Sequence, residues 1–447
     1  MKKMQKIVCS LLSVSVLFLA GCASSKVDHA KFDKCFESGE YGVCAEMLEK
    51  TRAAENIDTA IDISLLKNYA GNYKGSSECF EATNQALDDA FTKSITKGFA
   101  AAVGNENAKD YSGNVYEYIL VNAFNSLNYH NMGELKEALV EIRRIENKQK
   151  EYINKYGELI LSDENVSNSA MSSASSLGIN MNSVNSAIPE KAKRSDVYMD
   201  SPFAHYIAAL LYLKDDSGDP ELHEREYRAL NPNGASLAED FNIPRGMGRL
   251  DVVALAGKIK ERVEDNVVIP FYISDIPEMN PHLKYVWPSV KGVPDGNYTV
   301  RVKLSTGETK ALAVVENFDE AVNKDVATKA KKAFVKSFVR STVKEASVVA
   351  SAIVTYKACS NDMLRKLALI SIGPAINAVN LTETADIRQA KYFPGRVCGG
   401  GFTLKPGTYS ITVEYFSGNN LIASEKIDNI AVKAGNITLV ESVGVAK

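Results

Sequence analysis

Thr408-Tyr409-Ser410-Ile411-Thr412-Val413-Glu414-Tyr415 alternates polar and apolar residues one by one. This period of two is typical of a strand with one buried face, because successive side chains of a strand point to opposite sides of its sheet. Similar alternation occurs at Asn297–Leu304, Lys310–Val315 and Leu421–Lys433, with Gly, Asp and Asn between the segments. We therefore expect the chain after Leu250 to form a small β-sandwich or a curved sheet.

A long helical pattern interrupts these strands. From Asp319 to about Ala378, Ala, Val, Lys and Phe recur at helical spacing, as in the run Lys331–Arg340. One long helix or a helix pair over 319–380 would then divide the β-rich region into 250–318 and 381–447. Its apolar residues should pack on the sheet and on the helices before it, and a membrane-surface role is the lesser alternative.

Residues 28–160 have apolar residues at helical spacing and few prolines. Three short segments share one pattern, in which a helix end is followed by glycine, a polar residue and a large apolar residue, at Gly39, Gly71 and Gly133. The first two glycines are separated by nearly the roughly 34-residue period of tetratricopeptide repeats. We expect a tetratricopeptide-like array of helical hairpins, with an ordinary helical bundle as the alternative.

Two further segments follow this helical region. Residues 161–197 are rich in Ser and Asn and are expected to form a linker or loop, because they have little apolar area to bury. Residues 198–240 should add another helix pair, since Ser201 can cap a helix and Pro202 suits its first turn. The predicted fold is therefore α+β, a helical-hairpin array followed by a small β-sandwich-like domain with an inserted long helix or helix pair.

The chain begins with lysines and a short apolar run that ends in Leu19-Ala20-Gly21-Cys22. A basic start followed by a run too short to span a bilayer is typical of a secretory signal peptide, here 1–21. The four residues resemble the bacterial lipobox, which implies acylation of Cys22 and a lipidated tether at 22–27. Since Ala23 rather than Asp follows, we expect lipid anchoring at the outer membrane, with the body facing the periplasm or, alternatively, the cell surface. The other alternative is an ordinary signal peptide.

Charge and cysteine content limit the classes of partner. A net charge of −3 and an isoelectric point near 6.1 disfavour nucleic-acid binding. Apart from Cys9 and Cys22, the remaining cysteines are odd in number and include no Cys-x-x-Cys pair. Cys35 and Cys44 flank the Gly39 turn, so a disulfide between facing helices is conceivable.

We find no residue pattern typical of catalysis. The histidines lack metal-ligand spacing, and the chain has no nucleophile elbow, Walker A loop or dinucleotide-binding fingerprint. Gly399-Gly400-Gly401 is expected to form a loop or bulge before a strand that begins at Phe402. We therefore expect a protein that is not an enzyme and needs no metal or cofactor. The alternatives are an envelope hydrolase or transferase acting on glycan or peptide, or a carrier of an apolar ligand in the β-rich domain.

Polar residues on otherwise apolar helices are the candidate partner-binding residues. Such residues can line the groove of a helical-repeat array, although Glu117 and Arg143 could equally pair inside the domain. The candidates are Tyr116, Glu117, Asn122, Asn128, Glu141, Arg143 and Arg144. Further along the chain, Glu383, Asp386 and Arg388 are expected to form a charge network that fixes the turn before the last strands, with ligand recognition as the alternative.

Together these segments resemble a family of bacterial outer-membrane lipoproteins of uncharacterised activity with a tetratricopeptide-like N-terminal part. The resemblance rests on Asn105, Tyr111, Tyr116-Glu117, Leu127-Asn128-Tyr129, Gly133, Ala138, Val140-Glu141, Arg143-Arg144, Ser201-Pro202-Phe203, Arg340, Lys344, Glu383, Ala385-Asp386, Arg388, Pro394 and 404–409. Gln389-Ala390 departs from it, because an aromatic residue is expected there.

Members of this family look like companions of lipoproteins that activate penicillin-binding proteins. The resemblance therefore implies a role in the cell envelope. We expect a lipid-anchored, non-catalytic adaptor or scaffold that binds a periplasmic or envelope protein through a tetratricopeptide-like groove. The sequence does not indicate an oligomeric state.

Overall fold

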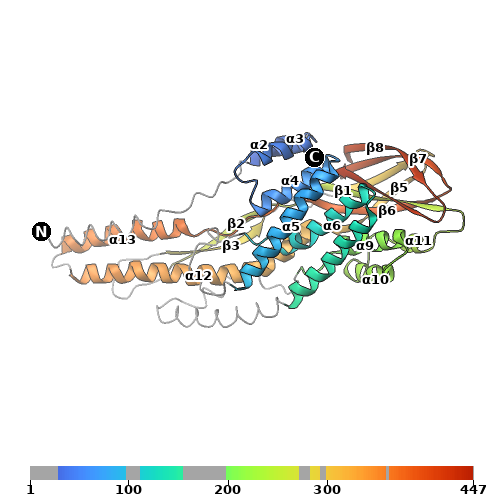
Figure 1. Cartoon of the computed structure of the whole chain (residues 1–447). Coiled ribbons are helices and arrows are strands. Elements are labelled where there is room, and N and C mark those ends of the chain that lie inside the picture. The colour runs from blue at the N-terminus through green and yellow to red at the C-terminus, as the bar shows by residue number, and fades with distance from the viewer. Residues whose placement is uncertain are drawn as a thin grey trace.

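The computed structural model describes residues 29–96, 111–154, 198–270, 282–291, 298–358 and 362–445. The predicted signal peptide, the tether with Cys22 and the predicted linker at 161–197 lie outside these ranges. The described chain is α+β, with a helical region first and then a seven-stranded sheet that contains an inserted helix pair (Figure 1).

The helical region is built from consecutive helices that lie beside one another (Figure 1). They are α2 (His29–Glu37), α3 (Tyr41–Glu49), α4 (Ile57–Tyr69), α5 (Tyr73–Thr96), α6 (Val115–Asn131), a helix over 135–154, α9 (Pro202–Asp215), α10 (Pro220–Leu230) and the short α11 (Ala238–Phe241). As predicted, Ser201 caps α9 by accepting a hydrogen bond from the Ala204 N–H at 3.1 Å, and Pro202 occupies the first turn.

The three predicted glycine turns are confirmed. Gly39, Gly71 and Gly133 have φ angles of +77°, +74° and +81°, which glycine adopts without the steric cost of a Cβ atom. At the second turn, the Gly71 N–H donates to Asn68 O at 2.8 Å and the next N–H donates to Lys67 O at 2.9 Å. This pair of bonds is the Schellman motif, and the other two turns repeat it. Each turn therefore ends one helix and reverses the chain into the next.

The strands of the second half form one mixed sheet. Its members are β1 (Gly248–Lys258), β4 (Tyr298–Leu304), β5 (Thr309–Asn317), β6 (Pro394–Leu404), β7 (Gly407–Ser417), β8 (Asn420–Val432) and β9 (Ile437–Gly444). Their order is β8-β7-β4-β5-β6-β1-β9, and only the β1–β9 pair is parallel.

The two edges of this sheet approach each other. The Glu425 carboxylate on β8 accepts hydrogen bonds from Ser442 Oγ at 2.6 Å and from the Val443 N–H at 3.0 Å, both on β9. The sheet is thus nearly closed, like a barrel. The predicted β-sandwich is wrong and the curved-sheet alternative is correct, because β5 pairs with both β4 and β6 and so joins all seven strands into one sheet.

β1 connects the sheet to the helices because both of its faces are buried. Leu250, Val252 and Ala254 belong to the core inside the curved sheet, whereas Val253 and Leu255 belong to the core shared with the helical region. The helices therefore cover the outer face of the sheet around β1.

Gly399, Gly400 and Gly401 lie within β6, so the predicted loop or bulge at this triplet is wrong. A Cβ atom on Gly399 would lie 2.7 Å from Tyr206 Oη, and one on Gly401 would lie 2.0 Å from a carboxylate oxygen of Asp251. Close packing on the outer face of the strand, rather than a turn, explains why glycine occupies these two positions.

The predicted helix pair is confirmed as α12 (Phe318–Ala358) and α13 (Asp362–Thr382). A separate antiparallel hairpin, β2 (Arg262–Pro270) and β3 (His282–Val290), packs against α12. These four elements extend away from the rest of the molecule (Figure 1). We call them the arm, and we call the helical region with the seven-stranded sheet the body.

An aromatic cluster joins the root of the arm to the body. Phe318, the first residue of α12, packs on Phe203 of α9, Phe124 of α6 and Phe393, with ring centroids 6.0 to 6.4 Å apart. All four rings are fully buried. Elements that are distant in the sequence therefore share one core.

Candidate functional site

A group of buried and half-buried charges lies where a segment over 383–393, between α13 and β6, crosses α4 and α6. We call this group the junction, defined by Asp62, Glu117, Arg262, Asp325 and Arg388. Asp62, Glu117, Arg262 and Asp325 each hold a backbone or charged group from another part of the chain, whereas Arg388 pairs with Asp386 in its own segment.

Glu117 starts α6 and reaches the crossing segment. One carboxylate oxygen accepts hydrogen bonds from the Asn114 N–H at 2.7 Å and from Tyr111 Oη at 2.5 Å. The first bond and the return bond from the Glu117 N–H to the Asn114 side chain make a capping box. The other oxygen accepts from the Ala390 N–H at 2.7 Å. The side chain is fully buried and does not pair with Arg143, so the predicted alternative of that ion pair is wrong.

Asp62 holds the same segment from α4. Its carboxylate accepts hydrogen bonds from the Lys391 and Tyr392 N–H groups at 2.7 and 2.9 Å, and Tyr69 Oη donates to Tyr392 O at 2.8 Å. Burial raises the pKa of Asp62 well above its usual value, against the lowering effect of the Tyr392 N–H. The helical region therefore binds this segment by its backbone.

Arg262 and Asp325 form a buried ion pair that connects the arm to α6. Asp325 also accepts a hydrogen bond from the Val115 N–H at 3.3 Å, and Lys329 lies 3.2 Å from it on the next turn of α12. The Arg262 N–H donates to the Gln389 side chain at 2.6 Å. Gln389 stands where the family resemblance predicts an aromatic residue, and its amide ties β2 to the crossing segment.

Asp386 and Arg388 form the predicted charge pair. The Arg388 guanidinium donates to both carboxylate oxygens of Asp386 at 2.8 and 2.7 Å, and it lies 5.1 Å from the centre of the Tyr111 ring. Although burial raises it, the pKa of Asp386 lies below its usual value because Arg388 stabilises the carboxylate. The structural role expected for this pair fits these contacts.

Glu383 belongs to a second network, in the arm. Its fully buried carboxylate accepts hydrogen bonds from Arg340 Nε at 2.7 Å and Lys344 Nζ at 2.9 Å, both on α12. Glu383 follows α13, so these bonds fix the end of α13 against α12. We predicted one charge network of Glu383, Asp386 and Arg388. In the structure, Glu383 instead bonds to Arg340 and Lys344, and Asp386 pairs with Arg388.

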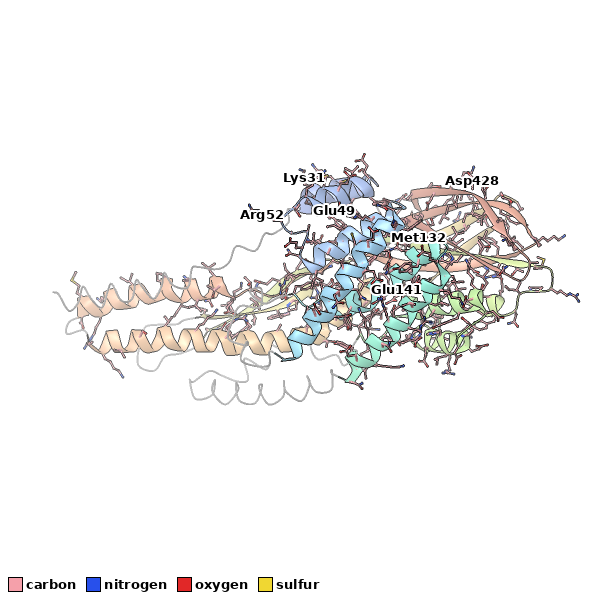
Figure 2. All side chains as sticks on the ribbon, viewed as in Figure 1. Lys31, Glu49, Arg52, Met132, Glu141 and Asp428 are labelled. Atoms are coloured by element: carbon pink, nitrogen blue, oxygen red, sulfur yellow. The ribbon has the colours of Figure 1, made fainter. Side chains whose placement is uncertain are left out.

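The other candidate partner-binding residues lie mainly inside the helical region. Glu141, in the middle of that region in Figure 2, accepts a hydrogen bond from Asn122 Nδ2 at 2.6 Å and pairs with Arg144 at 2.6 Å. Asn128 bonds to Asn68 at 2.9 Å. Five of the seven candidates are at most 1 % exposed: Tyr116, Glu117, Asn122, Asn128 and Glu141. This burial corrects the prediction that they line an open groove.

The two remaining candidates, Arg143 and Arg144, lie on the helix over 135–154 and keep some exposure. Arg144 is held by Glu81 and Glu141 at 2.8 and 2.6 Å, and Arg143 is a neighbour of Tyr212. Both therefore contact the domain itself.

Cys35 and Cys44 are free thiols in the structure, so the conceivable disulfide is not formed. The two thiols nevertheless lie within hydrogen-bond reach of each other. Burial and then the hydrogen bond with Cys35 raise the pKa of the Cys44 thiol. Cys22 lies outside the described residues.

Two histidines pair between α9 and α10. Their Nδ1 atoms are 3.0 Å apart, His205 Nε2 lies 3.0 Å from Asp200, and His223 Nε2 lies 3.3 Å from Glu146. Every ring nitrogen thus has a partner, as expected for histidines between helices.

An open cleft of about 560 Å³ lies between α11 and the outer face of β5 and β6. It is lined by Glu239, Asn242, Pro244, Glu308, Thr309, Lys310, Gly401, Phe402 and Thr403. Beside it, the buried guanidinium of Arg249 pairs with Asp240 at 2.8 Å and Asp251 at 3.0 Å and also contacts Glu239. The lining offers carboxylates, hydroxyls and one lysine to a polar molecule.

Within the described ranges, no three His, Cys, Asp or Glu side chains are placed to hold a metal ion. No helix there combines the length and apolar character needed to cross a bilayer.

Comparison of the chain with models of protein families, with curated proteins and with solved structures finds no match. The family resemblance therefore remains a prediction.

The sequence reasoning missed Asp62, Arg262 and Asp325. A signal for the first existed, because Asp62 stands between Ile61 and Ile63 in an apolar helix, where a charge has to be satisfied inside the fold. Arg262 and Asp325 had no such signal, since each stands between a charged residue and a valine rather than inside an apolar run.

Proposed function

We propose that this protein is a lipid-anchored, non-catalytic adaptor or scaffold of the bacterial cell envelope, and that it binds a protein partner through the arm. The observation that carries the proposal is the exposure of apolar side chains there. Among the described residues, the four most exposed large hydrophobic side chains all lie on α12 and α13: Val354, Met363, Ile370 and Leu381, which are 69 to 82 % exposed. Clustered exposed apolar groups of this kind are typical of protein contact surfaces.

The anchoring half of the proposal rests on the sequence. Leu19-Ala20-Gly21-Cys22 is the lipobox-like run, and several acyl chains on Cys22 would hold the body at the outer membrane without a spanning helix. The arm would then present its apolar side chains in the periplasm or at the surface.

The helical region supports a scaffolding role. Its hairpins turn at glycines with the same hydrogen bonds, which supports a tetratricopeptide-like array. Since Glu117 and Asn128 are buried, we assign this array to holding the sheet and the root of the arm in place. The proposed contact surface for the partner is therefore the arm and not the predicted groove.

The test is site-specific photo-crosslinking in intact envelopes. A photoreactive residue at Ile370 should give a reproducible adduct with a protein, and Leu381→Glu should abolish that adduct. The matched control is a photoreactive residue at Leu421, which is 55 % exposed on the body and should give none. If Ile370 and Leu421 give the same result, the arm is not the contact surface. In parallel, Cys22→Ser should release the chain from the membrane fraction.

A second candidate function rests on the cleft beside α11. Its volume and polar lining suit a sugar or a short peptide, so a hydrolase or transferase acting on envelope glycan or peptide is the alternative. Glu239→Gln and Glu308→Gln should then reduce binding or turnover of peptidoglycan fragments, while Glu46→Gln on the exposed face of α3 should not. The carrier alternative finds no support, because buried side chains such as Val252 and Tyr415 pack the interior of the sheet.

A further inference from the structure

Five residues of α13 whose exposure the structure describes lie on one side of the helix and form a stripe. Met363, Ile370, Pro374, Asn377 and Leu381 are all exposed, at successive spacings of seven, four, three and four residues. With 3.6 residues per turn, these five positions fall within about 60° of the helix circumference and cover about 27 Å of its axis. Apolar side chains open the stripe at Met363 and close it at Leu381.

The opposite side of α13 is already occupied. α13 packs against α12, and Ile376, which lies outside the stripe, is 4 % exposed. The stripe is therefore the side on which α13 has no partner within the described chain. An apolar stripe with 3-4 spacing is the surface by which one helix packs on another.

The composition of the stripe suits contact with an identical helix. From Leu367 to Leu381, α13 has no charged residue, so two copies can approach there without repulsion. Four of the five positions are also related by a two-fold axis. If two α13 helices lie antiparallel with Met363 opposite Leu381, then Ile370 lies opposite Pro374, and each contact occurs twice about a two-fold axis.

The charges at the start of α13 favour this direction of pairing. Asp362, Arg365 and Lys366 lie in the first turns of the helix, and Arg365 lies 3.7 Å from Asp362, so the net charge there is positive. A parallel pair would place these cations beside their own copies. An antiparallel pair places them beside the last turn of the partner helix, where the helix dipole is negative.

We propose that the arm dimerises, with α13 packing antiparallel on α13 of a second copy of this chain. This inference rests on the proposed function, since it names the partner of the same surface. One helix pair is small compared with the about 1,200 to 2,000 Å² of a stable interface, so the dimer should dissociate on dilution. Anchoring both copies to one membrane would raise their effective concentration and favour pairing.

The test is co-purification of two differently tagged copies of the full lipidated chain in mild detergent, supported by sedimentation equilibrium. Wild-type copies should co-purify. Met363→Glu and Leu381→Lys should each reduce recovery of the second copy at least tenfold. The double variant M363E/L381K should restore it, because antiparallel pairing sets each glutamate against a lysine of the other copy. Both positions are exposed, so each variant should keep the wild-type melting temperature.

Leu421→Glu on the body is the matched control and should leave co-purification unchanged. Wild-type copies that do not co-purify would overturn the pairing, and so would a double variant no better than its single variants. If copies fail to co-purify while Ile370 still crosslinks to a different protein, the pairing fails and the adaptor function stands. If Ile370 gives no adduct either, both proposals fail.

Discussion

The body and the arm differ in which residues they bury: the body buries polar side chains, and the arm exposes apolar ones. α6 in the body buries Glu117, Asn122 and Asn128 and gives each a hydrogen-bond partner, whereas α13 in the arm leaves Met363 and Ile370 exposed. Buried polar groups are stable when fully paired, and exposed apolar groups gain nothing from the chain that carries them. The difference teaches that α6 makes its contacts within the chain, whereas the exposed side of α13 has no contact within the described residues.

The largest effect should come from the aromatic cluster at the root of the arm. Phe393→Ala removes a fully buried ring beside Phe124 and Phe318, and it should lower the free energy of unfolding by about 3 to 5 kcal/mol. Equilibrium denaturation by urea measures this change. A loss below about 1 kcal/mol would mean that body and arm do not share one core.

The next effect tests the junction. Glu117→Ala leaves the Ala390 and Asn114 N–H groups without their acceptor inside the protein, and it should cost about 3 kcal/mol of unfolding free energy. Glu46→Ala on exposed α3 is the matched control and should cost less than about 0.5 kcal/mol. Equal losses in the two variants would contradict the role given to the junction.

A pH-dependent effect of similar or smaller size should come from Glu316. This carboxyl, at the end of β5, is hydrogen-bonded by Tyr198, Ser201 and the Phe203 N–H, and burial raises its pKa to about 7. The unfolded chain loses this proton near pH 4.3 while the folded chain keeps it. Stability should therefore fall between about pH 4 and pH 7.

Glu316→Gln should remove that decrease, by up to about 3 kcal/mol across this window. Melting temperatures of both proteins from pH 4 to pH 8 measure the difference. Parallel curves for wild type and variant would contradict the raised pKa.

The sequence predicted the features that depend on residues near one another in the chain, and it did not predict those that depend on contacts between distant residues. The glycine turns, the Ser201 cap, the alternating strands and the α12–α13 pair follow from local patterns, and the sequence predicted them. The single closed sheet did not follow, because β1 pairs with β6 and β9 at the far end of the chain. Nor did the junction, where Asp62 meets the Tyr392 N–H only after folding. The exposed side of α13 was missed because its apolar residues were assigned to internal packing.

A smaller effect tests the turns that shape the body. Gly71 has a positive φ angle, and no heavy atom lies within 4 Å of a Cβ atom placed there. Gly71→Ala should therefore cost about 1 kcal/mol from backbone strain alone. Thermal unfolding measures it, with Ala70→Gly, at the adjacent right-handed position, as a control. A cost above about 3 kcal/mol would indicate a packing role as well.

The smallest effect on stability should come from the arm. Ile370→Ser replaces a 70 % exposed side chain and should change the unfolding free energy by less than about 0.5 kcal/mol. It should nevertheless weaken association between copies in sedimentation equilibrium. A large loss of stability together with unchanged association would show that Ile370 serves the arm itself, and the contrast with the body would then disappear.

The parallel pairing of β1 with β9 has a consequence for how the molecule is made. β1 is synthesised before β6 and β9, the two strands that flank it, and the whole arm is made in between. During that interval an apolar strand has no neighbour, a state prone to aggregation. The newly made chain should therefore depend on a chaperone that holds unfolded proteins, and a nonsense codon just before Ile437 should yield a protein that is degraded rather than one that is merely shortened.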